Sequence, residues 1–187
     1  KFRKIFTLFI LAPIAGYSTL LQVPEQYSTI QSAISASNDQ DTVMVSPGYY
    51  QENISFNGKN IVVTSTYHIE QDSLIIGSTI IGGNNNGSVV LFAEGETNSS
   101  VLQGFTLQGG SGNYSDPDEN GTFYTYGGGV YCKESSPVLK DLVITNNTGD
   151  EGGGGGIFCY EASPTISGCI ISNNTTDDVG GGLYARN

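Results

Sequence analysis

The sequence predicts an all-β fold, a right-handed parallel β-helix solenoid that begins with a short capping helix. Three observations lead to this prediction. Related segments recur 27 residues apart in the second half of the chain. Each contains short apolar runs with the alternation that is typical of strands. Glycine, asparagine or Ser-Pro turns separate these runs. Because such a unit cannot close a core alone, successive copies must stack on one another.

The first segment, residues 1–18, resembles a secretory signal peptide. Lys1, Arg3 and Lys4 precede an apolar run from Ile5 to Ala15, and a basic start before a short apolar stretch is typical of such signals. The run is too short to span a bilayer as a helix. We therefore expect the mature chain to be secreted or displayed at the cell surface. A retained anchor or a buried helix is the alternative.

Residues 19–40 are expected to form an N-terminal cap that contains a helix over residues 28–36. Ser28 and Gln31 have the spacing of a capping box, with Ser28 at the N-cap and Gln31 at N3. The apolar residues that follow have helical periodicity. A short helix before a series of strands predicts a lid over the end of a β-stack.

The coils are expected over residues 41–187. Alternating pairs at Val43/Val45, Ile54/Phe56 and Ile61/Val63 predict the first strands. Residues 60–80 fit the repeat poorly, so not every strand there is assigned. The sequence ends in the middle of a coil, which exposes a strand edge. Either a longer chain or end-to-end packing with another molecule would cover that edge.

The repeat is clearest from residue 128 onward. The run Gly128-Gly129-Val130-Tyr131-Cys132 returns as Gly155-Gly156-Ile157-Phe158-Cys159, and a third copy begins 26 residues later at Gly181. Leu102, Phe105 and Leu107 lie 37 residues before their counterparts, so the extra ten residues are expected in a loop insertion at about 111–126. Ile80 precedes Leu107 by 27 residues, so we expect these two residues to occupy equivalent positions in adjacent coils. Leucine-rich repeats have a different leucine pattern, and propeller blades have a longer period. Neither fold is therefore expected here.

Composition and charge restrict the partners. The 187 residues include 7 Lys+Arg and 18 Asp+Glu, giving a formal charge of −11. Because nucleic-acid affinity depends on clustered basic residues, DNA and RNA are disfavoured as partners. The recurring apolar residues argue against disorder, and the bunched glycines exclude collagen.

Two parts of the sequence resemble known β-helix proteins. The segments Val23–Ile34 and Asp41–Ile54 look like the entry of secreted pectin-lyase-like right-handed β-helices. The Gly-Gly-Ile and Ile-x-Asn-Asn repeats are similar to bacterial surface β-helix repeats, including those of polymorphic outer-membrane adhesins. The resemblance covers nearly all of Val23–Asn187. It implies the fold and leaves the function open, because this superfamily includes lyases, hydrolases, esterases, binders and adhesins.

Outward-facing aromatic residues on the Gly-Gly strand are the candidate carbohydrate site. Counting from inward positions, Tyr131 points outward and stacks with its counterparts in the next copies. Aromatic faces beside carboxylates can dock sugar rings. Rings that merely stabilise the outer sheet surface are the alternative. The candidate residues are Tyr131, Phe158, Tyr160, Tyr184, Glu134 and Glu161.

Two acidic segments are candidate calcium sites. Asp116, Asp118 and Asn120 fit the first half of a calcium-loop pattern, although position twelve is glycine and flanking helices are absent. Asp150 and Asp177 occupy equivalent corners of adjacent coils, where a cation would offset their repulsion. Solvated acidic loops are the alternative in both places.

The remaining polar motifs are interpreted as structural. The equivalent asparagines at 146/173 and 147/174 should hydrogen-bond along the stack. Cys132, Cys159 and Cys169 are expected to be buried free thiols. His68, the only histidine, is expected in a surface loop without a catalytic partner.

The leading functional expectation is a non-enzymatic β-helix module that binds glycans or serves as an adhesin or structural stalk at the cell surface. The arginine, Asp-Phe-x-Phe-Gly and Asn-Thr-Asp signatures of the enzymatic relatives are not found. A polysaccharide lyase or glycoside hydrolase is the first alternative, since paired carboxylates can support glycoside hydrolysis. A filament-forming structural segment is the second.

Overall fold

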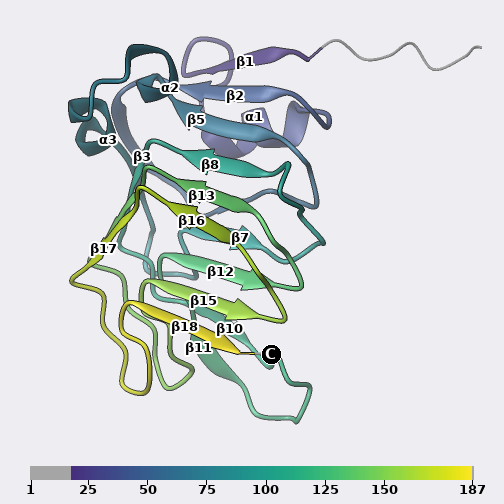
Figure 1. Ribbon diagram of the computed structural model, residues 1–187, viewed down its shortest axis with the longest axis vertical. Coiled ribbons are helices and arrows are strands. Elements are labelled where there is room, and N and C mark those ends of the chain that lie inside the picture. The colour runs from purple at the N-terminus through teal and green to yellow at the C-terminus, as the bar shows by residue number, and fades with distance from the viewer. Residues whose placement is uncertain (1–17, 187) are drawn as a thin grey trace, which may run out of the picture.

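The computed structural model describes residues 18–186, and its strands form the predicted parallel β-helix (Figure 1). The first sheet has the order β1 (Leu20–Val23), β2 (Thr42–Val45), β5 (Val62–Ser65), β8 (Val101–Gln103), β13 (Val138–Lys140) and β16 (Thr165–Ser167). The second has β3 (Gly48–Gln51), β6 (Thr79–Gly82), β9 (Thr106–Gln108), β14 (Val143–Thr145) and β17 (Ile170–Ser172). The third has β4 (Ile54–Ser55), β7 (Val90–Phe92), β12 (Val130–Lys133), β15 (Ile157–Tyr160) and β18 (Leu183–Arg186). Parallel pairing satisfies the backbone groups that a single coil would leave open.

Strand pairing confirms the 27-residue repeat. Val130 pairs with Ile157 in the third sheet, and Val138 pairs with Thr165 in the first. Within residues 111–126, where the insertion is expected, β10 (Asn113–Ser115) and β11 (Tyr124–Tyr126) form an antiparallel hairpin. We call residues 111–126 the insertion hairpin.

One register assignment is wrong by one residue. Ile81, not Ile80, pairs with Leu107, while Ile80 pairs with Thr106. Ile81 is accordingly fully buried, whereas Ile80 is only partly buried. The short helices α2 (Tyr67–Glu70) and α3 (Leu74–Ser78) lie between β5 and β6, which is why residues 60–80 did not fit the repeat. His68 lies on α2 and is exposed, as expected.

An asparagine ladder of Asn147 and Asn174 connects adjacent coils, which confirms the structural interpretation of this pair, whereas Asn146 and Asn173 occupy equivalent turns with a φ of 54°. The Asn147 amide nitrogen donates to Asn174 Oδ1 at 3.0 Å and to the Leu107 carbonyl at 3.0 Å. Asn147 is almost fully buried, and its hydrogen bonds satisfy turn backbone inside the stack.

The three cysteines are free thiols, as predicted. Cys132 and Cys159 are buried neighbours in the register, while Cys169 is only partly buried. The contact with Cys159, together with burial, raises the pKa of Cys132. These two thiols therefore pack as small apolar side chains.

The helix α1 (Ile30–Ala36) lies within the predicted span, but its cap is shifted. Thr29 and Ser32 form the capping box, not Ser28 and Gln31. The Glu52 carboxylate accepts hydrogen bonds from the backbone N–H groups of Ile30 and Gln31 at 2.9 and 3.0 Å. The Gln31 side chain takes no part in the cap and instead binds the backbone of Ser55 on β4.

The strand β1 was not predicted from the sequence. It pairs with β2 at the end of the first sheet and contacts α1. The proposed signal segment, residues 1–18, lies outside the described residues except for Ser18. Within residues 18–186, no helix has the length and apolarity needed to cross a membrane.

Candidate functional site

The aromatic column points outward, as predicted, but it is not an open platform. Tyr131 is in register with Phe158, and Phe158 with Tyr184. However, Tyr131 is only 2% exposed and Phe158 is fully buried. The expectation that these two rings present their faces to a ligand is therefore wrong.

The insertion hairpin covers the column. The Tyr126 ring lies 4.4 Å from the Phe158 ring, and together with Tyr131 these rings form a second apolar cluster outside the main core. A Cβ at Gly152 would lie 2.6 Å from the Tyr126 ring, so glycine is needed for this close packing. Burial and the nearby Asp118 carboxylate raise the pKa of Tyr126 to about 12.

The other predicted carbohydrate residues lie at the margin of this cluster. Tyr160 and Tyr184 are partly buried. Glu134 and Glu161 are exposed residues at equivalent turns, with φ angles of 50° and 46°. Tyr160 and both glutamates line a shallow cavity of about 220 Å³ that also includes Asp118. The structure thus brings part of the predicted carbohydrate set next to the predicted calcium loop.

Asp116, Asp118 and Asn120 lie in the acidic loop at the tip of the insertion hairpin. The Asp116 carboxylate accepts hydrogen bonds from the backbone N–H groups of Asn120 and Gly121 at 3.2 and 2.6 Å. Asp118 forms an ion pair with Arg186 at 2.5 Å. These contacts hold the loop and attach it to the last described strand.

Asp150 and Asp177 are exposed corner residues, and their side chains take part in no hydrogen bond or ion pair that the described residues form. Among residues 18–186, no group of three or more His, Cys, Asp and Glu side chains is arranged to hold a metal ion. Calcium at either acidic segment remains a prediction.

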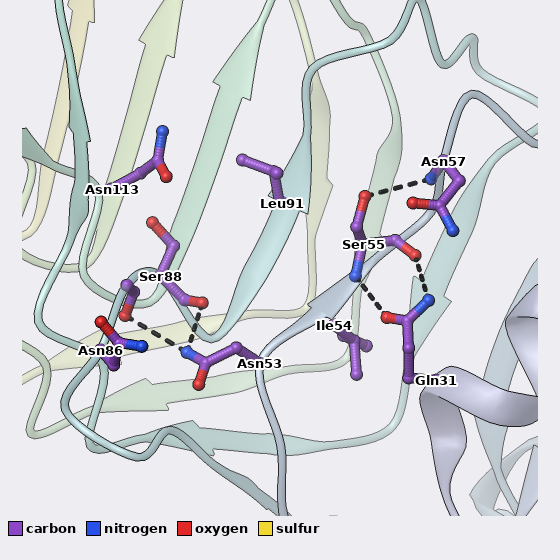
Figure 2. Close-up of a pocket in the computed structure, with 10 residues that line it drawn as sticks. Gln31, Asn53, Ile54, Ser55, Asn57, Asn86, Ser88, Leu91 and Asn113 are labelled. Carbon is purple, nitrogen blue, oxygen red and sulfur yellow. Dashed lines mark hydrogen bonds between the residues drawn. The ribbon is translucent and has the colours of Figure 1, made fainter.

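A polar groove opens on the third sheet where the insertion hairpin no longer covers it. Figure 2 shows Gln31 reaching in from the helix side, with Leu91 and Asn53 between it and Asn113. Asn113, on the first strand of the insertion hairpin, lies opposite. The cavity has a volume of about 320 Å³. We call it the amide groove and define it by Gln31, Asn53, Ser55, Asn86, Leu91 and Asn113.

Two amides of the groove are held by backbone groups. Gln31 Oε1 accepts from the Ser55 N–H at 2.7 Å, and its amide nitrogen donates to the Ser55 carbonyl at 3.2 Å (Figure 2). The Asn53 amide nitrogen donates to the carbonyls of Ser88 and Gly87 at 2.8 and 3.3 Å. These side chains are therefore fixed before any ligand arrives.

A second cavity of about 300 Å³ continues the groove along the insertion hairpin, sharing Asn86 and Asn113 with it. Tyr114 lines this extension and is 70% exposed. Its ring stacks on that of Phe123 at 5.5 Å and 28°. Exposed aromatic rings therefore lie on the insertion hairpin, not on the column of Tyr131 and Phe158 that the sequence pattern indicated.

Sequence reasoning missed the groove because its residues come from separate coils. Asn53, Asn86 and Asn113 lie in separate segments of the chain, outside the Gly-Gly strand repeat. The run Asn84-Asn85-Asn86-Gly87 was the available signal. It is also an ordinary turn sequence, so only the fold shows which amides share one opening.

The described residues thus define a parallel β-helix with a polar groove beside an inserted hairpin. The Chlamydia polymorphic membrane protein repeat matches residues 141–160 and 168–186, about a fifth of the chain. The matches run from β14 to β15 and from β17 to β18, so both cover the same part of a coil. No curated protein matches the chain.

Proposed function

We propose that this chain is an adhesin-like β-helix module exposed at a cell surface. The observation that carries the proposal is the polymorphic membrane protein repeat, which matches two successive coils. Its name associates the repeat with membrane proteins. A stack of parallel coils is also a suitable architecture for a stalk, because each coil contacts only its neighbours and extends the surface.

Adhesion through glycans is the finer part of the proposal. The residues that support it are those of the amide groove, together with the exposed Tyr114–Phe123 pair. Ligand sites commonly combine a concave surface with a few placed polar groups, and aromatic rings add apolar contact. The buried pair Tyr131 and Phe158 takes no part in this surface.

Bead adhesion tests the function directly. Beads coated with the full chain should be retained on cultured animal cells several-fold more than beads coated with albumin, and soluble chain should compete. Retention equal to that of albumin would reject the adhesive role. Antibodies against the chain should label intact cells that produce it. Labelling only after permeabilisation would contradict the surface location.

Calcium is proposed for the acidic loop of Asp116, Asp118 and Asn120, and more weakly for the corners at Asp150 and Asp177. Carboxylate and amide oxygens are suitable ligands for this cation. If calcium binds, the melting temperature should rise on calcium addition and fall with a chelator. A melting temperature that is independent of calcium would eliminate both sites.

A further inference from the structure

The amide groove and its extension are uncharged, although the chain is strongly acidic. No Asp, Glu, Lys or Arg lines either cavity in the described part of the chain, while the whole sequence has 18 acidic residues. An acidic ligand would find no basic side chain here, and a basic ligand would find no carboxylate. The groove therefore favours a ligand without charge.

Free amides provide the hydrogen-bonding capacity of the groove. Asn86 and Asn113 make no side-chain hydrogen bond with any of the residues that the structure describes. Each amide both donates and accepts, as a sugar hydroxyl does. Gln31 and Asn53, held by backbone groups, are fixed beside them at little further entropic cost.

Apolar contact is available at two points. Leu91 lines the groove and is partly exposed. The stacked pair of Tyr114 and Phe123 stands beside the extension and is exposed by 70% and 52%. The C–H face of a sugar ring can pack on such surfaces while its hydroxyl groups bind the amides.

The edge strand β4 argues against a peptide that adds as a strand. Gln31 binds both the N–H and the carbonyl of Ser55, and it thereby occupies the backbone positions that an added strand would need. Peptide binding by strand addition is therefore disfavoured at this edge of the third sheet.

We infer that the amide groove and its extension bind an uncharged oligosaccharide. The sugar lies between Asn53 and Asn113 and packs on Tyr114. This inference rests on the proposed adhesive function and identifies its ligand class. Hexoses and N-acetylhexosamines are both suitable, since both present hydroxyl groups and a C–H face without a charge.

The test is binding of the full chain to immobilised neutral oligosaccharides of hexoses and N-acetylhexosamines, beside sulfated and uronic-acid counterparts. We expect retention on neutral members and none on acidic ones. Asn86→Ala and Asn113→Ala should each weaken binding about tenfold, as loss of a ligand hydrogen bond predicts. Tyr114→Ala should weaken it by a similar factor.

Asn98→Ala and Tyr49→Ala are the matched controls, because both residues are exposed and lie outside the two cavities. They should bind like the original chain, and all variants should have matching melting temperatures. No binding to neutral sugars, preference for acidic ones, or unchanged binding by the groove variants would overturn the inference. Release of reducing or unsaturated ends would instead indicate a lyase or hydrolase.

The same variants separate this inference from the proposed function. If beads adhere to cells equally well with Asn86→Ala and Asn113→Ala, the ligand assignment is wrong and the adhesive role stands. If the chain binds neutral sugars at the groove but beads do not adhere, the adhesive role is wrong and the groove assignment stands.

Discussion

The outward face of the third sheet differs between its N-terminal and C-terminal coils. On β12 and β15, Tyr131 and Phe158 are buried beneath the insertion hairpin. On β4 and β7, Ser55 and Leu91 occupy the same column and face the amide groove. Position in the repeat thus determines where a side chain points, whereas the inserted segment determines whether it reaches solvent.

The largest loss of stability is expected in the region that the insertion hairpin covers. Phe158→Ala should destabilise the chain by about 3–5 kcal/mol, because it removes a fully buried ring and leaves a cavity. Phe123→Ala, at an exposed ring, should cost far less. Chemical denaturation measures both. Equal losses would show that the insertion hairpin does not cover Phe158 in solution.

Adding one methyl group should displace the insertion hairpin. Gly152→Ala places a Cβ 2.6 Å from the Tyr126 ring and should cost about 1–3 kcal/mol through overpacking. Gly77→Ala is the control, since no atom lies within 4 Å of its added Cβ. Hydrogen exchange of residues 113–126 should accelerate in the first variant. Unchanged exchange there would contradict the proposed packing.

Alkaline pH should weaken the same contact. The folded-state pKa of Tyr126, about 12, lies above the ordinary value of 10.0. Folding therefore favours the neutral phenol, and its contribution to stability is complete below pH 10 and lost as the pH rises to 12. Denaturation measured across this pH range should show a falling free energy of unfolding, and Tyr126→Phe should reduce that fall. A loss of stability that Tyr126→Phe leaves unchanged would contradict this assignment.

The smallest effect is expected at the ion pair between Asp118 and Arg186. Asp118→Asn should cost about 0.5–1 kcal/mol, because the arginine is 45% exposed and solvent screens the pair. High salt should remove most of the difference. Lys133→Met, which breaks the longer contact to Glu134 at 3.5 Å, is the matched comparison and should cost less. A salt-independent loss at Asp118 would indicate another role for this residue.

Much of the fold could be predicted because the repeat is a local pattern. The pairing of Cys132 with Cys159 and the asparagine ladder follow from equivalent positions in stacked coils. The shift at Ile80 arose where α2 and α3 interrupt the period. The helix cap lies one residue later than predicted because Thr29 and Ser32 offer the same local box, and Glu52, distant in sequence, also binds the start of α1.

The site was harder to predict because exposure depends on contacts between distant segments. Alternation correctly places Tyr131 on the outer face but does not show that Tyr126 folds back near it. Likewise, the helix pattern in the sequence predicts that Gln31 is a capping residue. In the folded chain it binds Ser55 and forms one side of the groove.

Hydroxyl-radical footprinting, with and without a retained neutral oligosaccharide, tests the central claim most directly. The account predicts that Tyr114 and Phe123 are oxidised in the free chain, and that Tyr114 is protected when sugar is present. Tyr131 and Phe158 should stay unmodified in both states because the insertion hairpin covers them. Oxidation of Tyr131 and Phe158 in the free chain, with protection by sugar, would contradict the account and restore the aromatic column as the binding surface.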